Sequence, residues 1–280
     1  MAILVTGATG NVGSQVVREL NERGAGVRAF VRDPARAAEL LGPEVEPVTG
    51  DLSDAAAIRR ALDGVERVFL SSADGPQKVA HEAAVIDAAE AAGVELVVKA
   101  STMQARAGSP LPPLDWNGRV EEHLRRSAVP GAVLGSGFYM TNLLMPGAFI
   151  APAGQGRIAM IGPCDIGAVA AVVLTTDGHA GETYRLTGPE AISYERAAAE
   201  LAAATGEEVE YADVPPEAAQ AALAAAGLPG WLLAHLIGMY ALIRADAFAR
   251  TTGTVQALTG RPARTWARFA QERAARPVAR

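Results

Sequence analysis

Three glycines near the start of the chain stand three residues apart, in the stretch VTGATGNVGSQVV at residues 5–17. They follow an apolar run and open an amphipathic helical pattern, so they join a strand to a helix. Gly7 permits a sharp turn, Gly10 lets backbone amides approach an anion, and Gly13 lets the helix lie close to the sheet. Amides at a helix start, where the dipole is positive, bind phosphate groups. This motif predicts a dinucleotide site that holds a pyrophosphate, with a merely structural tight loop as the alternative.

Two arginines at the end of the second predicted strand indicate which dinucleotide is bound. That strand and its continuation read VRAFVRDPAR, residues 27–36. NAD-binding folds place a carboxylate here, about 20 residues past the glycines, against the ribose 2'-hydroxyl. Arg32 and, one helical turn later, Arg36 instead favour a 2'-phosphate, with which a guanidinium can pair. Asp33 before Pro34 is typical of a helix cap. We expect NADP(H) to be preferred, with NAD(H) possible if Asp33 takes the ribose.

The elements that must position these residues alternate between apolar runs and helical patterns. The predicted strands are residues 2–5, 27–31, 45–48, 67–70, 96–100 and 132–134. The predicted helices between them cover about 12–20, a segment after the Asp33 cap, a segment that Ser53 can cap, 79–92 and 116–126. A strand and a helix repeated five times imply an α/β fold, a Rossmann doubly wound parallel sheet with helices on both faces.

The pattern changes beyond residue 135. Glycine and proline loops there separate short strands, at 183–186 and 209–212, from alanine-rich helices, at 194–204 and 217–226. We therefore predict an NAD(P)-binding Rossmann domain over residues 1–150. The remainder, 151–280, is expected to be mainly a smaller C-terminal substrate lobe, with one or two elements returning to the sheet.

Composition limits the classes of function. The chain has 280 residues, 50% of them hydrophobic, so it can bury a sizeable core. Its net charge is -6 and its arginines are scattered, so no nucleic-acid partner is expected. The single cysteine, Cys164, and four histidines without ligand spacing predict neither a disulfide nor a metal site. Because no signal-type segment occurs and the apolar stretch 228–243 is short for a bilayer span, we expect a cytoplasmic monomer or homodimer with no membrane partner.

A series of sequence blocks extends over nearly the whole chain. In order they are VTGATGNVG, VRAFVRDPARA, VTGDLSD, GVERVFLSS, AAEAAGVELVVKAST, GSGFYMTNLL, DIGAVAAVVL and GETYRLTGPEAISYERAAAELAAATG. The glycine motif specifies only the cofactor fold, whereas the ordered blocks identify a branch. The chain resembles the NmrA-like branch of the atypical short-chain dehydrogenases, and within it the bacterial NAD(P)H quinone oxidoreductases.

That resemblance implies a set of cofactor-binding residues. The pyrophosphate would be held by Gly7, Thr9, Gly10, Asn11, Val12 and Gly13. The 2'-phosphate would meet Arg32, and the adenine would be bordered by Asp51 and Leu52. The nicotinamide side would be lined by Ser71 and Ser72, and its ribose approached by Lys99 and Ser101.

One departure from the short-chain dehydrogenases concerns the catalytic pair. Enzymes of this class that reduce ordinary carbonyls use a tyrosine with a lysine four residues later as proton donor pair. None of the five tyrosines is followed by lysine at that spacing, and Pro113 and Asn117 stand where the pair would fall. In addition, NmrA-like proteins commonly have the sequence LRP before the aromatic-rich block, and this chain has LGS at 134–136. An arginine that commonly shapes the pocket in that family is therefore missing. Alcohol dehydrogenation by the usual route is therefore not expected.

A quinone is a substrate that suits a site without that pair. Hydride transfer to a quinone gives a delocalised anion that needs less protonation in the transition state than an alkoxide does, and positioning alone can supply about 7 to 11 kcal/mol. We therefore predict an NADPH-dependent reductase of quinones or related conjugated aromatics. The predicted catalytic residues, which would donate a hydrogen bond to the developing oxyanion, are Lys99 and Tyr139. The predicted substrate-binding residues are Phe138, Tyr139, Asn142 and Trp231.

Several of these residues have alternative roles, and the chain has alternative functions. Phe138 and Tyr139 can equally be core residues, since aromatic side chains bury large apolar areas wherever they fall. Lys99 can instead form an ion pair or a solvated end. For the whole chain, the missing pair favours a non-catalytic NADP(H)-sensing regulatory protein as a second function. A third is a tailoring or coupling enzyme that acts on aromatic polyketide-type quinones.

Overall fold

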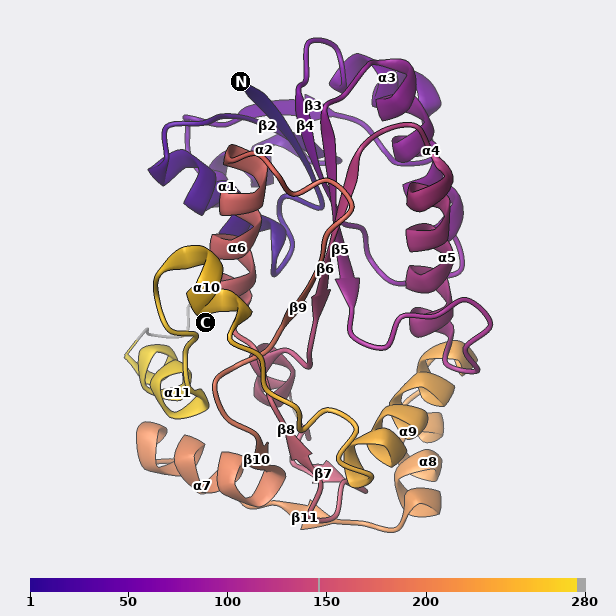
Figure 1. Ribbon diagram of the computed structural model, residues 1–280. Coiled ribbons are helices and arrows are strands. Elements are labelled where there is room, and N and C mark those ends of the chain that lie inside the picture. The colour runs from indigo at the N-terminus through magenta and orange to yellow at the C-terminus, as the bar shows by residue number, and fades with distance from the viewer. Residues whose placement is uncertain (146, 276–280) are drawn as a thin grey trace. The chain divides into compact units, whose positions relative to one another are not determined.

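A seven-stranded sheet organises the first of two units. The computed structural model describes residues 1–145 and 147–275. The strands of this sheet are β1 (Ala2–Thr6), β2 (Gly26–Val31), β3 (Glu46–Thr49), β4 (Arg67–Leu70), β5 (Leu96–Thr102), β6 (Gly131–Ser136) and β9 (Thr183–Leu186). Their order is β3-β2-β1-β4-β5-β6-β9, and the pairs from β3 to β6 are parallel (Figure 1). The strands β2 and β3 lie on one side of β1, and β4, β5 and β6 lie on the other. Doubly wound sheets bind their ligands at the point where the strand order reverses in this way, here between β1 and β4.

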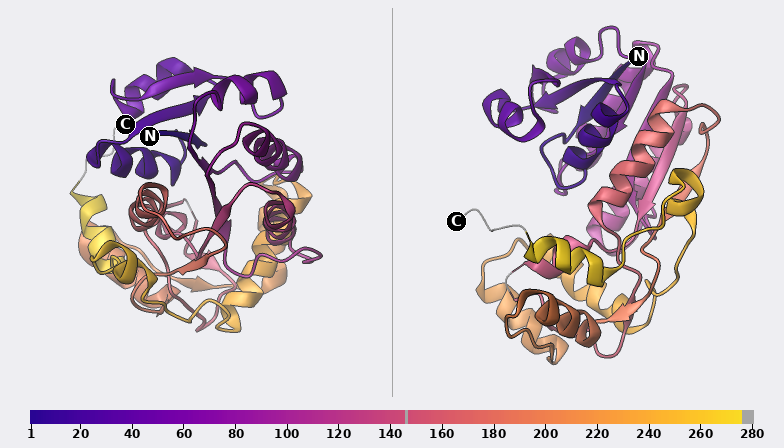
Figure 2. Two further views of the ribbon diagram at one scale, coloured as in Figure 1. Left: turned by 45° about the horizontal axis from the view of Figure 1, so that its top comes forward. Right: turned by 90° about the vertical axis from the view of Figure 1, so that its left-hand side faces the viewer.

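Helices cover both faces of this sheet. They are α1 (Gly13–Glu22), α2 (Pro34–Leu41), α3 (Ala55–Ala61), α4 (Lys78–Ala91), α5 (Pro112–Arg126) and α6 (Pro163–Thr175). Figures 1 and 2 show α1 and α6 on one face, and α4 and α5 on the other. Beneath α4 and α5 lies a core that includes Ile86, Val97 and Val120, each fully buried. The predicted Rossmann architecture is therefore confirmed, and it brings the carboxyl ends of β1, β4 and β5 to one edge.

The second unit consists of short strands and helices. Its elements are a 3-10 helix (Met140–Leu144), β7 (Ile150–Ala151), β8 (Arg157–Ile158), β10 (Ile192–Ser193), α7 (Tyr194–Thr205), β11 (Ala212–Asp213), α8 (Pro216–Ala225), α9 (Gly230–Arg244), α10 (Thr254–Thr259) and α11 (Trp266–Ala274). The Trp266 indole is buried and donates to the carbonyl of Ala197 at 2.9 Å, which holds α11 against α7. Among the residues that the structure describes, no helix has the length and apolar character needed to cross a bilayer.

The division between the units falls at Ser136, not at the expected residue 150. Residues 1–136 and 163–185 form the first unit, and 137–162 with the chain from 186 onward form the second. The reason is local: β6 ends at Ser136, while α6 and β9 return to the sheet. Close packing against α1 holds α6 there, because a Cβ on Gly167 would lie 2.8 Å from the backbone of Gln15.

Helix starts show where local sequence signals succeed and fail. Asp33 caps α2 as predicted, and its carboxylate accepts from the Arg36 amide at 3.0 Å. The prediction that Ser53 caps α3 is wrong. Asp54 is the cap, accepting from two amides of the first turn, while Ser53 donates to the carboxylate of Asp51. A carboxylate accepts helix-start amides at least as well as a hydroxyl, so adjacent Ser and Asp left the cap ambiguous in the sequence.

Candidate active site

The glycine loop between β1 and α1 is built from backbone contacts. Gly7 has a φ of +62°, and a Cβ added there would lie 2.9 Å from the carbonyl oxygen of Ser71. At Gly13 an added Cβ would lie only 2.1 Å from the Gly7 oxygen, so helix and loop touch directly. Gly10 differs from both, since an added Cβ would meet only that same oxygen, at 3.1 Å. Gly7 and Gly13 are therefore needed for close contacts between backbone segments, whereas Gly10 has only one protein atom near its added Cβ.

The start of α1 has no side-chain cap. Val12 is its N-cap and gives no side-chain hydrogen bond to the first turn. Thr9, half-buried, and Asn11, exposed, lie in the turn that leads into it. Helix starts beside glycine loops commonly bind phosphate groups, although the amides of Ser14 and Gln15 already donate here to the carbonyls of Gly10 and Val12. The predicted pyrophosphate residues thus form one continuous segment.

The end of β2 carries the residues predicted to select the dinucleotide. Arg32 and Arg36 are both exposed. Since Asp33 is engaged in the cap of α2, its carboxylate is committed to the backbone. Asp51 lies beyond β3, where hydrogen bonds from the hydroxyl and the amide of Ser53 lower the pKa of the Asp51 carboxyl. This end of the sheet therefore presents cationic side chains together with an ionised carboxylate.

Between β1 and β4 the strand ends are joined by a reciprocal hydrogen bond. The Ser71 amide donates to the Thr6 hydroxyl, and that hydroxyl donates to the Ser71 carbonyl, each at 2.8 Å. Thr6 is buried and immediately precedes Gly7. The glycine loop and the loop after β4 are therefore held as one structure. Leu52, after β3, packs partly buried against the core below α4.

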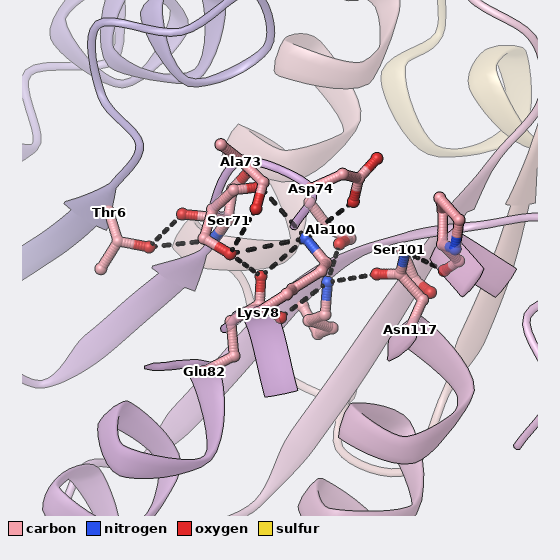
Figure 3. Close-up of polar contacts among 12 residues, drawn as sticks. Thr6, Ser71, Ala73, Asp74, Lys78, Glu82, Ala100, Ser101 and Asn117 are labelled. Atoms are coloured by element: carbon pink, nitrogen blue, oxygen red, sulfur yellow. Dashed lines mark hydrogen bonds and ion pairs between the residues drawn. The ribbon is translucent and has the colours of Figure 1, made fainter. Parts of the chain in front are cut away.

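A buried ionic network fills the space behind the ends of β4 and β5. Glu82 on α4 is fully buried, with one carboxylate oxygen 3.0 Å from Lys99 Nζ and the other 3.0 Å from Lys78 Nζ. Ser72 Oγ donates to the carboxylate at 2.7 Å. Lys99 also donates to Asn117 Oδ1 at 2.9 Å, and to the carbonyl of Ala100 (Figure 3). Both lysines of the chain therefore contact one carboxylate.

Charges within the network decide its protonation. Burial by itself would raise the pKa of Glu82, but the ammonium groups of Lys99 and Lys78 outweigh it and hold that pKa below its ordinary value. Burial lowers the pKa of Lys99, and the carboxylate of Glu82 offsets this only in part. Glu82 therefore stays ionised, and its negative charge is what makes two buried lysines tolerable.

Lys99 forms the ion pair that the sequence left open as its alternative role. Its ammonium donates to Asn117 and Ala100 and forms an ion pair with Glu82. Asn117, which the sequence predicts to stand where the lysine of the usual catalytic pair would fall, therefore contacts the ammonium of Lys99. Donation to a substrate oxyanion, which stays a prediction, would require Lys99 to release one of these acceptors.

One turn further along α5, a second carboxyl meets the end of β5. Ser101 is buried, and its hydroxyl donates to Glu121 Oε1 at 2.5 Å. Arg125 lies 3.7 Å from the other carboxylate oxygen. Burial raises the pKa of Glu121 despite the lowering effects of Ser101, Lys99 and Arg125. The two predicted ribose-side residues, Lys99 and Ser101, thus share one face of β5, each with a carboxyl partner.

Comparison with known proteins places this arrangement in a family. The sequence model of the NmrA-like family matches residues 1–249. This chain belongs to the NmrA-like family. An NAD(P)H azoreductase of Xenophilus azovorans is 39% identical over 280 residues, which cover 98% of this chain and 98% of that protein. Quinone oxidoreductase 2 of Escherichia coli is 35% identical over 240 residues, covering 82% and 84% of the two chains.

A solved structure supports the same placement. The crystal structure of an Escherichia coli NADPH-dependent quinone oxidoreductase, in complex with NADPH, matches this NmrA-like protein with a TM-score of 0.87 at 32% identity. The match covers 96% of this chain and 99% of that one. It confirms the resemblance predicted from the sequence blocks, over both units.

The raised pKa of Glu121 predicts a pH-dependent stability that glutamine removes. The folded protein holds this proton at pH values where the unfolded chain has lost it. The free energy of unfolding should therefore fall as the pH rises from the ordinary value of 4.5 through the raised pKa. Glu121→Gln keeps an acceptor for Ser101 and cannot titrate, so its stability relative to the wild type should increase across that window. Urea unfolding at a series of pH values measures the difference, and a difference that is constant with pH would contradict the assignment.

The predicted substrate residues of this NmrA-like protein all lie in the second unit. Phe138 and Tyr139 lead into the 3-10 helix, and the Ile161 amide donates to the Phe138 carbonyl at 2.9 Å. Asn142 lies within that short helix, and Trp231 begins the first turn of α9. Their roles in substrate binding stay predictions.

Sequence reasoning missed Lys78 and Glu82, and did not connect Thr6 to Ser71. Two signals were available in the sequence. The chain has only two lysines, and Lys78 stands four residues before Glu82, the spacing of an ion pair on one helix face. Such pairs are usually exposed and weak, so the spacing alone did not show that this one is buried.

Proposed function

We propose that this protein is an NADPH-dependent reductase that transfers a hydride to a quinone or a related conjugated aromatic substrate. The observation that carries the proposal is the glycine loop. An added Cβ at Gly10 would meet only the Gly7 oxygen, the helix start beside it has no side-chain cap, and Gly7 abuts the carbonyl oxygen of Ser71 after β4. The similarity to an azoreductase and a quinone oxidoreductase supports the choice of reaction. A cytoplasmic location, and a monomer or homodimer, belong to the same proposal.

The residues present fit NADP(H). The loop from Gly7 to Gly13 would hold the pyrophosphate, Arg32 and Arg36 the 2'-phosphate, and Asp51 and Leu52 would border the adenine. On the other side of the β1–β4 junction, Ser71, Ser72, Lys99 and Ser101 would face the nicotinamide and its ribose. When bound, NADPH supplies a hydride, that is, both electrons and one hydrogen of the reduction.

Negative charge develops on the substrate during that transfer, and residues of this chain could stabilise it. A quinone becomes a delocalised anion that takes up one proton to give the hydroquinone, so a strong proton donor is not needed in the transition state. The positive charge of Lys99 and a hydrogen bond from Tyr139 are the contributions that we propose. Phe138, Asn142 and Trp231 would bind the flat substrate.

A panel of quinones and azo dyes, followed by the loss of NADPH absorbance, tests this function. We expect NADPH oxidation that depends on the substrate and that, with the quinones, yields one hydroquinone per NADPH. If NADPH binds with no oxidation by any of these acceptors, the NADP(H)-sensing regulator, which the missing Tyr-x-x-x-Lys pair favours, would replace the reductase. Products of doubled mass would instead indicate the coupling enzyme for aromatic polyketide-type quinones.

Arg32 is expected to determine the preference for NADPH over NADH. A charge-assisted hydrogen bond to the 2'-phosphate contributes about 1.5–3 kcal/mol, so Arg32→Ala should weaken NADPH binding by about tenfold or more. NADH has no 2'-phosphate, so its dissociation constant should change little. Calorimetric titration of both nucleotides gives the two values. An unchanged preference in the variant would remove Arg32 from the site.

A further inference from the structure

The loop between β4 and α4, residues 71–77, is fixed at its first residue by β1. Ser71 exchanges two hydrogen bonds of 2.8 Å with Thr6, and its carbonyl oxygen abuts Gly7. In a doubly wound sheet the adenine half of a dinucleotide lies on one side of this junction and the other half lies on the β4–β5 side. The conformation of this loop therefore bears on the nicotinamide half of the site.

Lys78, the first residue of α4, ties down the rest of that loop. Its ammonium reaches back to the carbonyl oxygen of Ser72 at 3.0 Å and to the carboxylate of Asp74 at 3.4 Å (Figure 3). It also lies 3.0 Å from Glu82, one turn along the helix. The side chain is only 4% exposed, although Asp74 is 47% exposed. A single buried cation thus joins the loop to the helix that follows it.

The buried carboxylate of Glu82 holds the ammonium group of Lys78 in place. Glu82 is fixed by Lys99 at 3.0 Å and by the Ser72 hydroxyl at 2.7 Å. Removing Lys78 changes the charge of the buried groups from +1 to zero, because Glu82 and Lys99 remain as a balanced pair. What is lost is the contact with the loop, which makes Lys78 a selective probe of that loop.

We propose that Lys78 is a positioning residue that holds the loop 71–77 in the conformation that binds the nicotinamide half of NADP(H). This inference rests on the proposed cofactor. Lys78 acts through Ser72 and Asp74, and the adenine half of the site, at β2 and β3, does not depend on it.

Calorimetric titration with two ligands distinguishes this role from a general destabilisation of the folded protein. The ligands are NADPH and 2',5'-ADP, which has the adenine and the 2'-phosphate but no nicotinamide. Lys78→Met removes a hydrogen bond from a charged group that holds the loop, so a smaller fraction of the protein has the binding-competent loop. It should therefore weaken NADPH binding about tenfold and leave 2',5'-ADP binding unchanged. Lys78→Arg should restore most of the affinity. Arg126→Met is the matched control, because it removes one positive charge from an exposed site on α5 and should change neither affinity.

Hydrogen exchange provides a second readout that needs no ligand. Amides of the loop 71–77 should exchange faster in Lys78→Met, while those of β1 and β5 stay protected. Asp74→Ala, which removes the exposed carboxylate that pairs with Lys78, should speed exchange in the same loop to a smaller extent. Equal weakening of both ligands, unchanged NADPH binding, or unaltered exchange in both variants would overturn the proposal. If the wild type binds 2',5'-ADP but not NADPH, the proposed function fails instead.

Discussion

Replacing Glu82 with glutamine is expected to lower the free energy of unfolding by about 3–5 kcal/mol, the cost of breaking a buried ion pair by removing one partner. The neutral amide leaves the ammonium groups of Lys78 and Lys99 buried without a counter-charge. Stability of this size is a large fraction of what a typical protein has. Urea unfolding near neutral pH, followed by circular dichroism, gives the difference directly.

The matched control for this variant is Glu122→Gln on α5. Glu122 pairs with Arg126 at 3.1 Å on the surface, and its loss should cost about 0–1 kcal/mol. The loss of unfolding free energy in Glu82→Gln should also become smaller at alkaline pH. Burial lowers the pKa of Lys99 even in the wild type, so the folded variant sheds a proton that the unfolded chain still holds, and stability then rises with pH. A loss no larger than that of the control would show that Glu82 does not neutralise the lysines.

Substitution of Gly10 by valine is expected to abolish cofactor binding while the fold survives. An added Cβ at this position meets only the Gly7 oxygen, at 3.1 Å, so the chain can accommodate it with a small shift. The isopropyl group would then occupy the space in which a pyrophosphate approaches the backbone. We expect the dissociation constant for NADPH to rise by about a hundredfold or more, which corresponds to about 2.7 kcal/mol.

Two other glycines calibrate this experiment. Gly253→Val introduces the same side chain where no atom lies within 4 Å, so NADPH binding should be unchanged. Gly13→Val should disturb the fold itself, because its Cβ would lie 2.1 Å from the Gly7 oxygen. Thermal unfolding and NADPH titration of the three variants separate the two effects. Normal NADPH binding by folded Gly10→Val would rule out the glycine loop as the phosphate site.

Much of the first unit was predictable because its signals are local. Apolar runs located the six strands from β1 to β6 to within a few residues at each end, and Asp33 before Pro34 marked the start of α2. The start of α5 was less clear. The predicted helix began at Trp116, but α5 begins at Pro112, since proline is tolerated in the first turn of a helix while also being a common loop residue.

The network around Glu82 was not predictable in the same way. Its members come from α4, β5 and α5, and no periodicity in the sequence indicates that Lys78 and Lys99 approach the same carboxylate. A charged residue in an amphipathic helix is ordinarily assigned to solvent. Only the tertiary fold, which stacks α4 and α5 over the end of β5, reveals which face these side chains occupy.

The burial of both lysines has a practical consequence for chemical labelling. Lys78 is 4% exposed and Lys99 is fully buried, and the sequence contains no other lysine. Acylating reagents that attack primary amines should therefore react with neither lysine side chain while the protein is folded. Acylation at Lys78 or Lys99 would then be a sensitive report that the interior of the sheet has opened.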